Sequence, residues 1–194
     1  MFKRFKKIAL MILALSVLAG CGEQSRVEKS TISIGKEGAL TVTLIEDFSE
    51  SYYDQEELKT MIDKEVAEYN TKAGSDKIAV AAFEAADGKV RLEQTYADAS
   101  DYAKFNGCDF FWGTVAQAYA LGTEVPDMTG VDDSGKISGS KILENSEYHI
   151  VITDETYDVV VPGKILYVSE GVKAEGKDTA VIEEETEKAF IVYQ

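Results

Sequence analysis

The sequence predicts an α+β fold with a mostly antiparallel sheet, one main amphipathic helix and a strand-rich C-terminal part. Near the N-terminus, two segments in which apolar and polar residues alternate around a turn lie on either side of a segment whose apolar residues repeat with the period of a helix. Towards the C-terminus, the sequence contains only short segments of alternating apolar and polar residues. The chain has 194 residues, of which 45% are hydrophobic, so one domain can bury a core without a metal or a disulfide. We expect residues 31–194 to form a single domain, with a split into two lobes near residues 123–145 as the alternative.

The domain is predicted to begin with a hairpin followed by the main helix. Apolar residues alternate on both sides of Gly35–Gly38, which predicts two antiparallel strands within Thr31–Phe48. The period then becomes helical from Asp54, which can form a capping box with Glu57. We expect this helix to end within residues 70–74 and to bury Leu58, Met61, Ile62, Val66 and Tyr69.

A second hairpin and two short helices follow. Alternation on both sides of Asp87-Gly88 predicts a hairpin over Lys77–Tyr96, since Asp-Gly is a strong hairpin-turn signal. Ser100–Gly107 is typical of a short helix closed by glycine, and the apolar run Phe110–Val115 leads into a helical turn over Ala116–Leu121. The buried face of the second hairpin is predicted to hold Val80, Ala82, Val90 and Leu92.

The C-terminal part is predicted to consist of strands. Before it, Thr123–Asn145 is rich in Gly, Ser and Asp, and we expect a long surface excursion there. Short apolar runs then alternate with turn residues. They predict strands at Tyr148–Thr153, Tyr157–Val161, Lys164–Ser169, Thr179–Glu183 and Lys188–Tyr193.

Residues 1–20 have the layout of an export signal. A basic stretch is followed by the 12-residue apolar run Ile8–Ala19 and then by small residues up to Cys21. A retained anchor helix is the alternative, but a membrane-spanning helix needs about 20 apolar residues. We therefore expect residues 1–20 to be a cleaved signal peptide.

The residues Leu18-Ala19-Gly20-Cys21 resemble the lipobox of bacterial lipoproteins. The resemblance implies cleavage before Cys21 and attachment of a diacylglyceryl group to its sulfur, often with a further acyl chain such as palmitate on the new N-terminus. Two or more acyl chains hold a protein stably on a bilayer. We expect residues 21–30 to be the lipidated N-terminus and a flexible tether, and the domain to face outside the cytoplasm at the cell membrane.

The predicted mature chain is strongly acidic. All four charged residues among the first 20 are basic, so residues 21–194 hold 16 basic and 35 acidic residues, a net charge of −19. Such a surface repels nucleic-acid phosphates, and the chain has no cluster of Lys and Arg that could neutralise them. Nucleic acid is therefore excluded as a partner, and a cationic partner is favoured over an anionic one.

Few residues suggest chemistry. His149 is the only histidine and falls in a predicted strand, and Cys108 lies among apolar residues next to Asp109, where a thiolate is disfavoured. The acidic loop with Asp127, Asp132, Asp133 and Ser134 has oxygen donors for calcium, but Lys136 breaks the ligand spacing of an EF-hand loop. The sequence thus predicts no catalytic residue, no cofactor-binding residue and no metal site.

Aromatic residues gather between residues 52 and 112. They either pack in the core, which is the usual use of large rings, or line a groove for sugars or peptides. The residues are Tyr52, Tyr53, Tyr96, Tyr102, Phe105, Phe110, Phe111 and Trp112.

Two segments, Ser51–Asn70 and Tyr102–Asn106, are similar to small uncharacterised lipoproteins of Gram-positive bacteria, a resemblance that implies no known activity. We predict a membrane-anchored lipoprotein that is not an enzyme and acts as a binding or interaction module at the cell envelope. A receptor for a small solute, peptide or cation is the alternative, and an envelope hydrolase is the third candidate.

Overall fold

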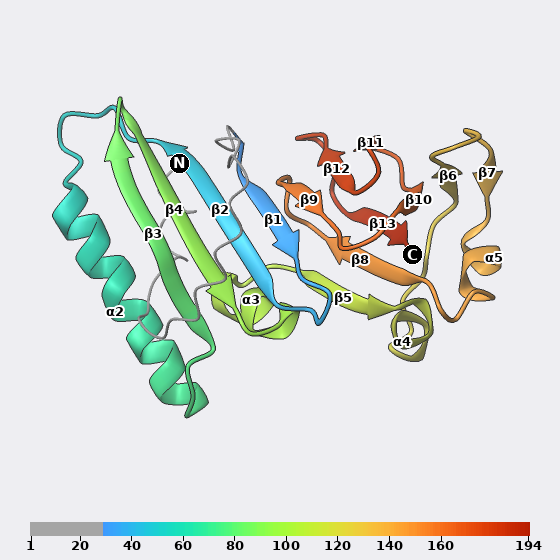
Figure 1. The fold of residues 1–194 in the computed structure, drawn as a ribbon, viewed down its shortest axis with the longest axis horizontal. Coiled ribbons are helices and arrows are strands. Elements are labelled where there is room, and N and C mark those ends of the chain that lie inside the picture. The colour runs from blue at the N-terminus through green and yellow to red at the C-terminus, as the bar shows by residue number, and fades with distance from the viewer. Residues whose placement is uncertain (1–28) are drawn as a thin grey trace.

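The strands of this protein divide between two sheets. The computed structural model describes residues 29–194, which form an α+β fold and confirm the predicted fold class (Figure 1). Sheet A has the strand order β11-β12-β9-β1-β2-β4-β3, and sheet B the order β5-β8-β13-β10-β6-β7. Every pairing within the described residues is antiparallel except that of β1 with β9.

The bounds of the strands follow the predicted runs closely, except that β6, β7 and β11 have no predicted counterpart. Sheet A contains β1 (Thr31–Ile34), β2 (Leu40–Asp47), β3 (Ile78–Ala86), β4 (Lys89–Tyr96), β9 (Asp158–Val160), β11 (Val172–Glu175) and β12 (Thr179–Ile182). Sheet B contains β5 (Phe110–Thr114), β6 (Met128–Gly130), β7 (Lys136–Ile137), β8 (His149–Thr153), β10 (Ile165–Val168) and β13 (Ala189–Tyr193). The helices are α2 (Gln55–Ala73), α3 (Ala99–Asn106), α4 (Val115–Ala120) and α5 (Gly139–Leu143).

Helix α2 begins and ends where the sequence predicts. The Asp54 carboxylate accepts hydrogen bonds from the backbone N–H groups of Glu56 and Glu57 at 2.8 and 3.0 Å, and Gly74 ends the helix with a φ of 69°. Three predicted residues are buried, while Met61 and Tyr69 are only partly so. The three are Leu58, Ile62 and Val66.

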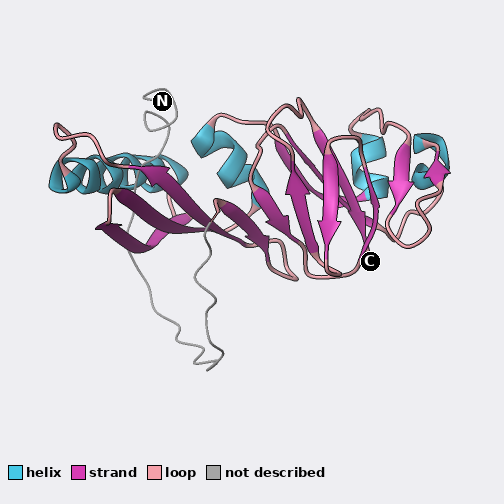
Figure 2. Cartoon of the chain, turned by 90° about the horizontal axis from the view of Figure 1, so that it is seen from above, coloured by secondary structure: helices cyan, strands magenta, loops and turns pink. Residues whose placement is uncertain are grey.

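Two hydrophobic clusters hold the layers together. The larger one joins α2 and α3 to the inner face of sheet A and continues into sheet B through residues such as Val151 and Ile191. The smaller one packs α4 and α5 against the opposite face of sheet B, around Ile150 and Val192. Figure 2 shows the long helix α2 lying on one side of sheet A.

The predicted surface excursion over Thr123–Asn145 is wrong. This stretch adds β6 and β7 to sheet B and forms α5. Met128 and Ile142 are 1% and 0% exposed, so widely spaced apolar residues fold a segment whose polar composition predicts a loop.

Of the two β3 residues predicted to be buried, Ala82 lies on the wrong face, and β11 was not predicted. Val80 pairs with Gln94 but Ala82 pairs with Glu93, because the register shifts between them. This β-bulge turns Ala82 to the face opposite Val80. Strand β11 was missed because its sequence, Val-Lys-Ala-Glu, contains only two apolar residues.

Candidate functional site

Acidic residues flank five adjacent strands at one edge of sheet B. The register pairs Phe110, at the start of β5, with Thr153, at the end of β8, and Thr153 in turn with Ala189, at the start of β13. The end of β10 and the start of β6 lie at the same edge. We call this row the acidic edge, and it consists of Asp109, Asp127, Asp154, Glu155, Glu170 and Glu187.

The acidic edge has little positive charge to balance it. Among the described residues directly flanking these strand ends, Lys188 is the one cation, with its Nζ 2.8 Å from Asp109 Oδ2. Adjacent strands lie about 4.8 Å apart, so the carboxylates on neighbouring strand ends contribute to one region of negative potential. A cation that binds there is attracted by more than one carboxylate.

Cys108 lies at the same edge, opposite Glu155. The sulfur and one carboxylate oxygen each from Asp154 and Glu155 lie within 4.8 Å of one another, and the Asp154 carboxylate also accepts a hydrogen bond from the Asp109 backbone N–H at 2.9 Å. Burial, the neighbouring carboxylates and a hydrogen bond to Glu155 raise the pKa of the Cys108 thiol to about 12.

The thiol therefore keeps its proton at neutral pH and is a poor nucleophile, in line with its environment in the sequence. The Cys108, Asp154 and Glu155 atoms are a donor set that could hold a metal ion only if the thiol lost that proton. The sequence gives no local sign of this cluster, because 45 residues or more separate Cys108 from its neighbours and only the pairing of β5 with β8 unites them.

His149 lies between two aromatic rings on sheet B. Its ring stacks on Trp112 and on Tyr193, with centroid distances of 5.9 and 5.4 Å, and Trp112 Nε1 donates to Tyr193 Oη at 2.6 Å. The turn between β1 and β2 closes over this group, because a Cβ on Gly38 would lie 2.3 Å from Trp112. The three rings thus connect the two sheets, and the ring contacts of His149 are with aromatic side chains.

The acidic residues of the loop with oxygen donors for calcium lie at separate places in the structure. Asp127 belongs to the acidic edge, whereas Asp132 pairs with Lys164 beyond β6. The Asp133 carboxylate accepts a hydrogen bond from the Gly135 backbone N–H at 2.9 Å and so closes its own turn. The carboxylates that the sequence suggested as calcium donors therefore do not converge on one point.

The aromatic residues also separate into groups. Four of them pack edge to face in the main cluster, with centroids 5.0 to 6.0 Å apart. Tyr52 and Tyr53 form a second group with Phe48 at the end of sheet A, where Tyr52 is 66% exposed. Phe111 packs in the smaller cluster. The four in the core are Tyr96, Tyr102, Phe105 and Phe110.

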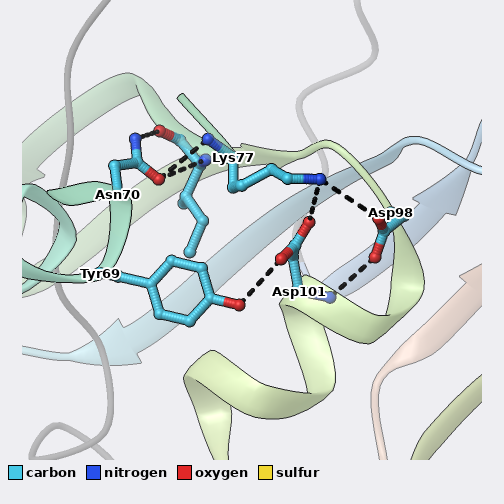
Figure 3. A network of polar contacts seen from close by, with 6 residues as sticks. Tyr69, Asn70, Lys77, Asp98 and Asp101 are labelled. Carbon is cyan, nitrogen blue, oxygen red and sulfur yellow. Dashed lines mark hydrogen bonds and ion pairs between the residues drawn. The ribbon is translucent and has the colours of Figure 1, made fainter. Parts of the chain in front are cut away.

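A polar network joins α2, β3 and α3 (Figure 3). Lys77 Nζ lies 3.2 Å from Asp101 Oδ2 and 3.6 Å from Asp98 Oδ2, and Tyr69 Oη donates to Asp101 Oδ1 at 2.9 Å. Burial and the Asp101 carboxylate raise the pKa of Tyr69 to about 12. Desolvation disfavours the Asp98 carboxylate, but the hydrogen bond from the Asp101 backbone N–H and the charge of Lys77 outweigh it and lower its pKa.

This network stabilises the fold and offers little to a ligand. Asp101 and Asn70 are 7% and 3% exposed. Asn70 Oδ1 accepts from the backbone N–H groups of Lys77 and Ile78 at 2.9 and 3.1 Å, and its Nδ2 donates to the Ile78 carbonyl at 3.1 Å. The side chain of Asn70 thus ties the last turn of α2 to the start of β3.

The predicted lipobox, with Cys21, lies outside the described residues. None of the helices within residues 29–194 is both long and apolar enough to cross a membrane. Searches of protein-family models, of curated proteins and of solved structures found no match to this chain.

Proposed function

We propose that this chain is a lipoprotein, anchored through Cys21 in the cell membrane with its domain outside the cytoplasm, and that the domain binds a cationic partner along the acidic edge. The acidic edge is the observation that carries the binding proposal, since it concentrates charge on five neighbouring strand ends. The anchor rests on the sequence Leu18-Ala19-Gly20-Cys21.

The geometry favours binding over catalysis by the described residues. The thiol of Cys108 holds its proton, and the imidazole of His149 is stacked between two rings. A row of carboxylates with one lysine attracts cations over several ångströms and raises the rate at which a positively charged partner arrives. Because the attraction is electrostatic, binding should weaken with salt.

The test is a variant that neutralises part of the edge without breaking an ion pair. In Asp154→Asn/Glu170→Gln/Glu187→Gln, none of the three carboxylates has an ion-pair partner among the described residues. An octalysine peptide serves as the probe, with its affinity measured by titration calorimetry at low and high salt. We expect several-fold weaker binding by the variant.

The matched control removes the same charge elsewhere, with Glu37→Gln/Glu50→Gln/Glu68→Gln at exposed positions outside the edge. Its affinity for octalysine should stay close to that of the unchanged chain. Equal weakening in both variants would show that the peptide follows total charge, and the edge would then be no binding site.

A cation receptor is the second candidate, and the Cys108 donor set favours it. Titration with Zn²⁺ tests it by thermal unfolding, because a ligand at 100 times its dissociation constant adds about 2.7 kcal/mol to stability. The expected shift in Tm should disappear in Cys108→Ala. A shift that persists in Cys108→Ala, or none in either chain, would reject this candidate.

A further inference from the structure

One face of sheet A is covered by none of the described helices. Alternation along the strands and their register place fourteen side chains of β1, β2, β3 and β4 on the side away from the main cluster. We call this the outer face. It consists of Thr31, Ser33, Thr41, Thr43, Ile45, Asp47, Ala79, Ala82, Glu84, Ala86, Lys89, Arg91, Glu93 and Thr95.

The helices lie elsewhere. Helices α2 and α3 pack against the inner face of sheet A, and α4 and α5 pack against sheet B. In Figure 2, α2 and α3 both lie above the long strands of sheet A, and no described helix or strand lies below them. The outer face therefore has no helix layer over it, and of its side chains Thr31 and Thr43 are buried, at 8% and 6% exposed.

The outer face is nearly neutral in a very acidic chain. It holds three acids and two bases, and Arg91 Nη2 is paired with Glu93 Oε2 at 3.1 Å. One row across the strands, Ser33, Thr41, Thr95 and Ala79, carries no charge. Its side chains are short, and those of Ser33, Thr41 and Thr95 present hydroxyl groups that can hydrogen-bond to polar lipid headgroups.

The tether reaches the fold in the middle of sheet A. Strand β1 is the fourth of seven strands, and Ser30, just before it, accepts a hydrogen bond through Oγ from the Ile45 backbone N–H at 3.0 Å. Eight residues, 21–28, separate Lys29 from the predicted end of the signal peptide. Fully extended they span about 27 Å, and as a coil about 16 Å.

The tether must reach the bilayer from one side of sheet A. On the inner side, the layer formed by α2 and α3, about 10 Å thick, would take up most of the span of a coiled tether of about 16 Å. The end of sheet A where β1 begins carries Glu50, Asp54 and Asp87 in its loops and is repelled by anionic lipid. The outer face carries a small net charge and has no described helix over it, so it is the favoured side.

We propose that the outer face of sheet A lies against the membrane surface, so that the acidic edge of sheet B stays accessible to solvent. The proposal rests on the anchoring of Cys21 that we propose as part of the function. The two proposals nevertheless fail separately, because a chain can be anchored with a different face towards the lipid.

The experiment uses the full chain, lipidated in a bacterial host and reconstituted in vesicles of phosphatidylcholine and phosphatidylglycerol with a headgroup spin-labelled lipid. In a Cys108→Ala background, lipidation of Cys21 leaves an introduced cysteine as the one free thiol. A fluorophore is attached in Thr95→Cys on the outer face, Tyr52→Cys at the end of sheet A, or Glu68→Cys on α2.

We expect the label at Thr95 to be quenched several-fold more than the labels at Tyr52 and Glu68. A second outer-face label, in Thr41→Cys, should repeat the result if the substitution at Thr95 disturbs the sheet. Strongest quenching at Tyr52 would overturn the proposal in favour of an end-on orientation. Equal, weak quenching at all positions on vesicle-bound protein would also overturn it and would leave the outer face free for a protein partner.

Failure of the chain to float with the vesicles would instead refute the anchoring itself, and the orientation with it. Circular dichroism of each labelled variant checks that the sheet is intact.

Discussion

Replacement of Asn70 by alanine should cost the fold a large share of its stability. The side chain makes three hydrogen bonds to backbone groups of Lys77 and Ile78 and is 3% exposed. Without it, two N–H groups and one carbonyl lose their partner at a largely buried site. One unpaired buried group costs about 1–3 kcal/mol, and partial rehydration at Lys77 lowers the sum, so we expect a loss of about 2–4 kcal/mol.

Urea unfolding followed by circular dichroism measures this loss as a lower midpoint with an unchanged m-value. The matched control is Asn145→Ala, because the side chain of Asn145 makes one hydrogen bond, from Nδ2 to the Lys141 carbonyl at 3.1 Å, at an exposed site. The control should lose less than about 1 kcal/mol. A loss below about 1 kcal/mol in Asn70→Ala, or equal losses in both variants, would show that the three hydrogen bonds of Asn70 add little to stability.

Three further predictions concern other contacts. Gly38→Ala should destabilise the chain by about 2 kcal/mol or more and change the fluorescence of Trp112. The new Cβ would lie 2.3 Å from the Trp112 ring, on a residue whose φ is 89°. Unchanged urea unfolding would argue against this contact. The pKa of Asp98 is lower in the folded chain than in the unfolded chain, where it is about 3.9. The Asp98 carboxylate therefore stabilises the fold above a pH of about 3.9, and this stabilisation is lost as the pH falls through the pKa of the folded chain. Asp98→Asn should therefore flatten the acid limb of a stability profile, and an identical limb would contradict this. The thiol of Cys108, with a pKa of about 12, should react with a disulfide reagent at pH 8 far more slowly than in the denatured chain, whereas rapid native labelling would show a reactive thiolate.

The local elements of the fold were predictable because their signals are local. Asp87 and Gly88 have φ values of 53° and 71°, the left-handed conformations that a two-residue hairpin turn requires and that Asp-Gly adopts readily. Asp54 and Gly74 bound α2 for similar reasons of capping and backbone freedom. In each case a few neighbouring residues are enough to determine the structure.

The arrangement of the elements was not predictable in this way. The parallel pairing of β1 with β9 joins Ile32 to Val159 across more than 120 residues, and neither strand alone indicates its partner. The bulge between Val80 and Ala82 depends on the register with β4. An alternating pattern predicts that a strand has a buried face, but it does not reveal where an extra residue shifts that face.

The candidate site was likewise predictable from the sequence only in part. The excess of acidic residues and the preference for a cationic partner follow from composition. The edge itself arises only when β5, β8, β13, β10 and β6 are placed side by side, since its residues range from Asp109 to Glu187. Cys108 is a lone cysteine in the sequence and becomes part of a donor set only through Asp154 and Glu155.

Intact-mass and peptide mass spectrometry of the chain extracted from bacterial membranes shows whether Cys21 anchors the chain. If the chain is an anchored lipoprotein, its N-terminal residue is Cys21 and carries the mass of a diacylglyceryl group, while Cys21→Ser yields no lipidated form. An N-terminus at another residue, or an unmodified Cys21 on protein that still sediments with membranes, would contradict this anchoring.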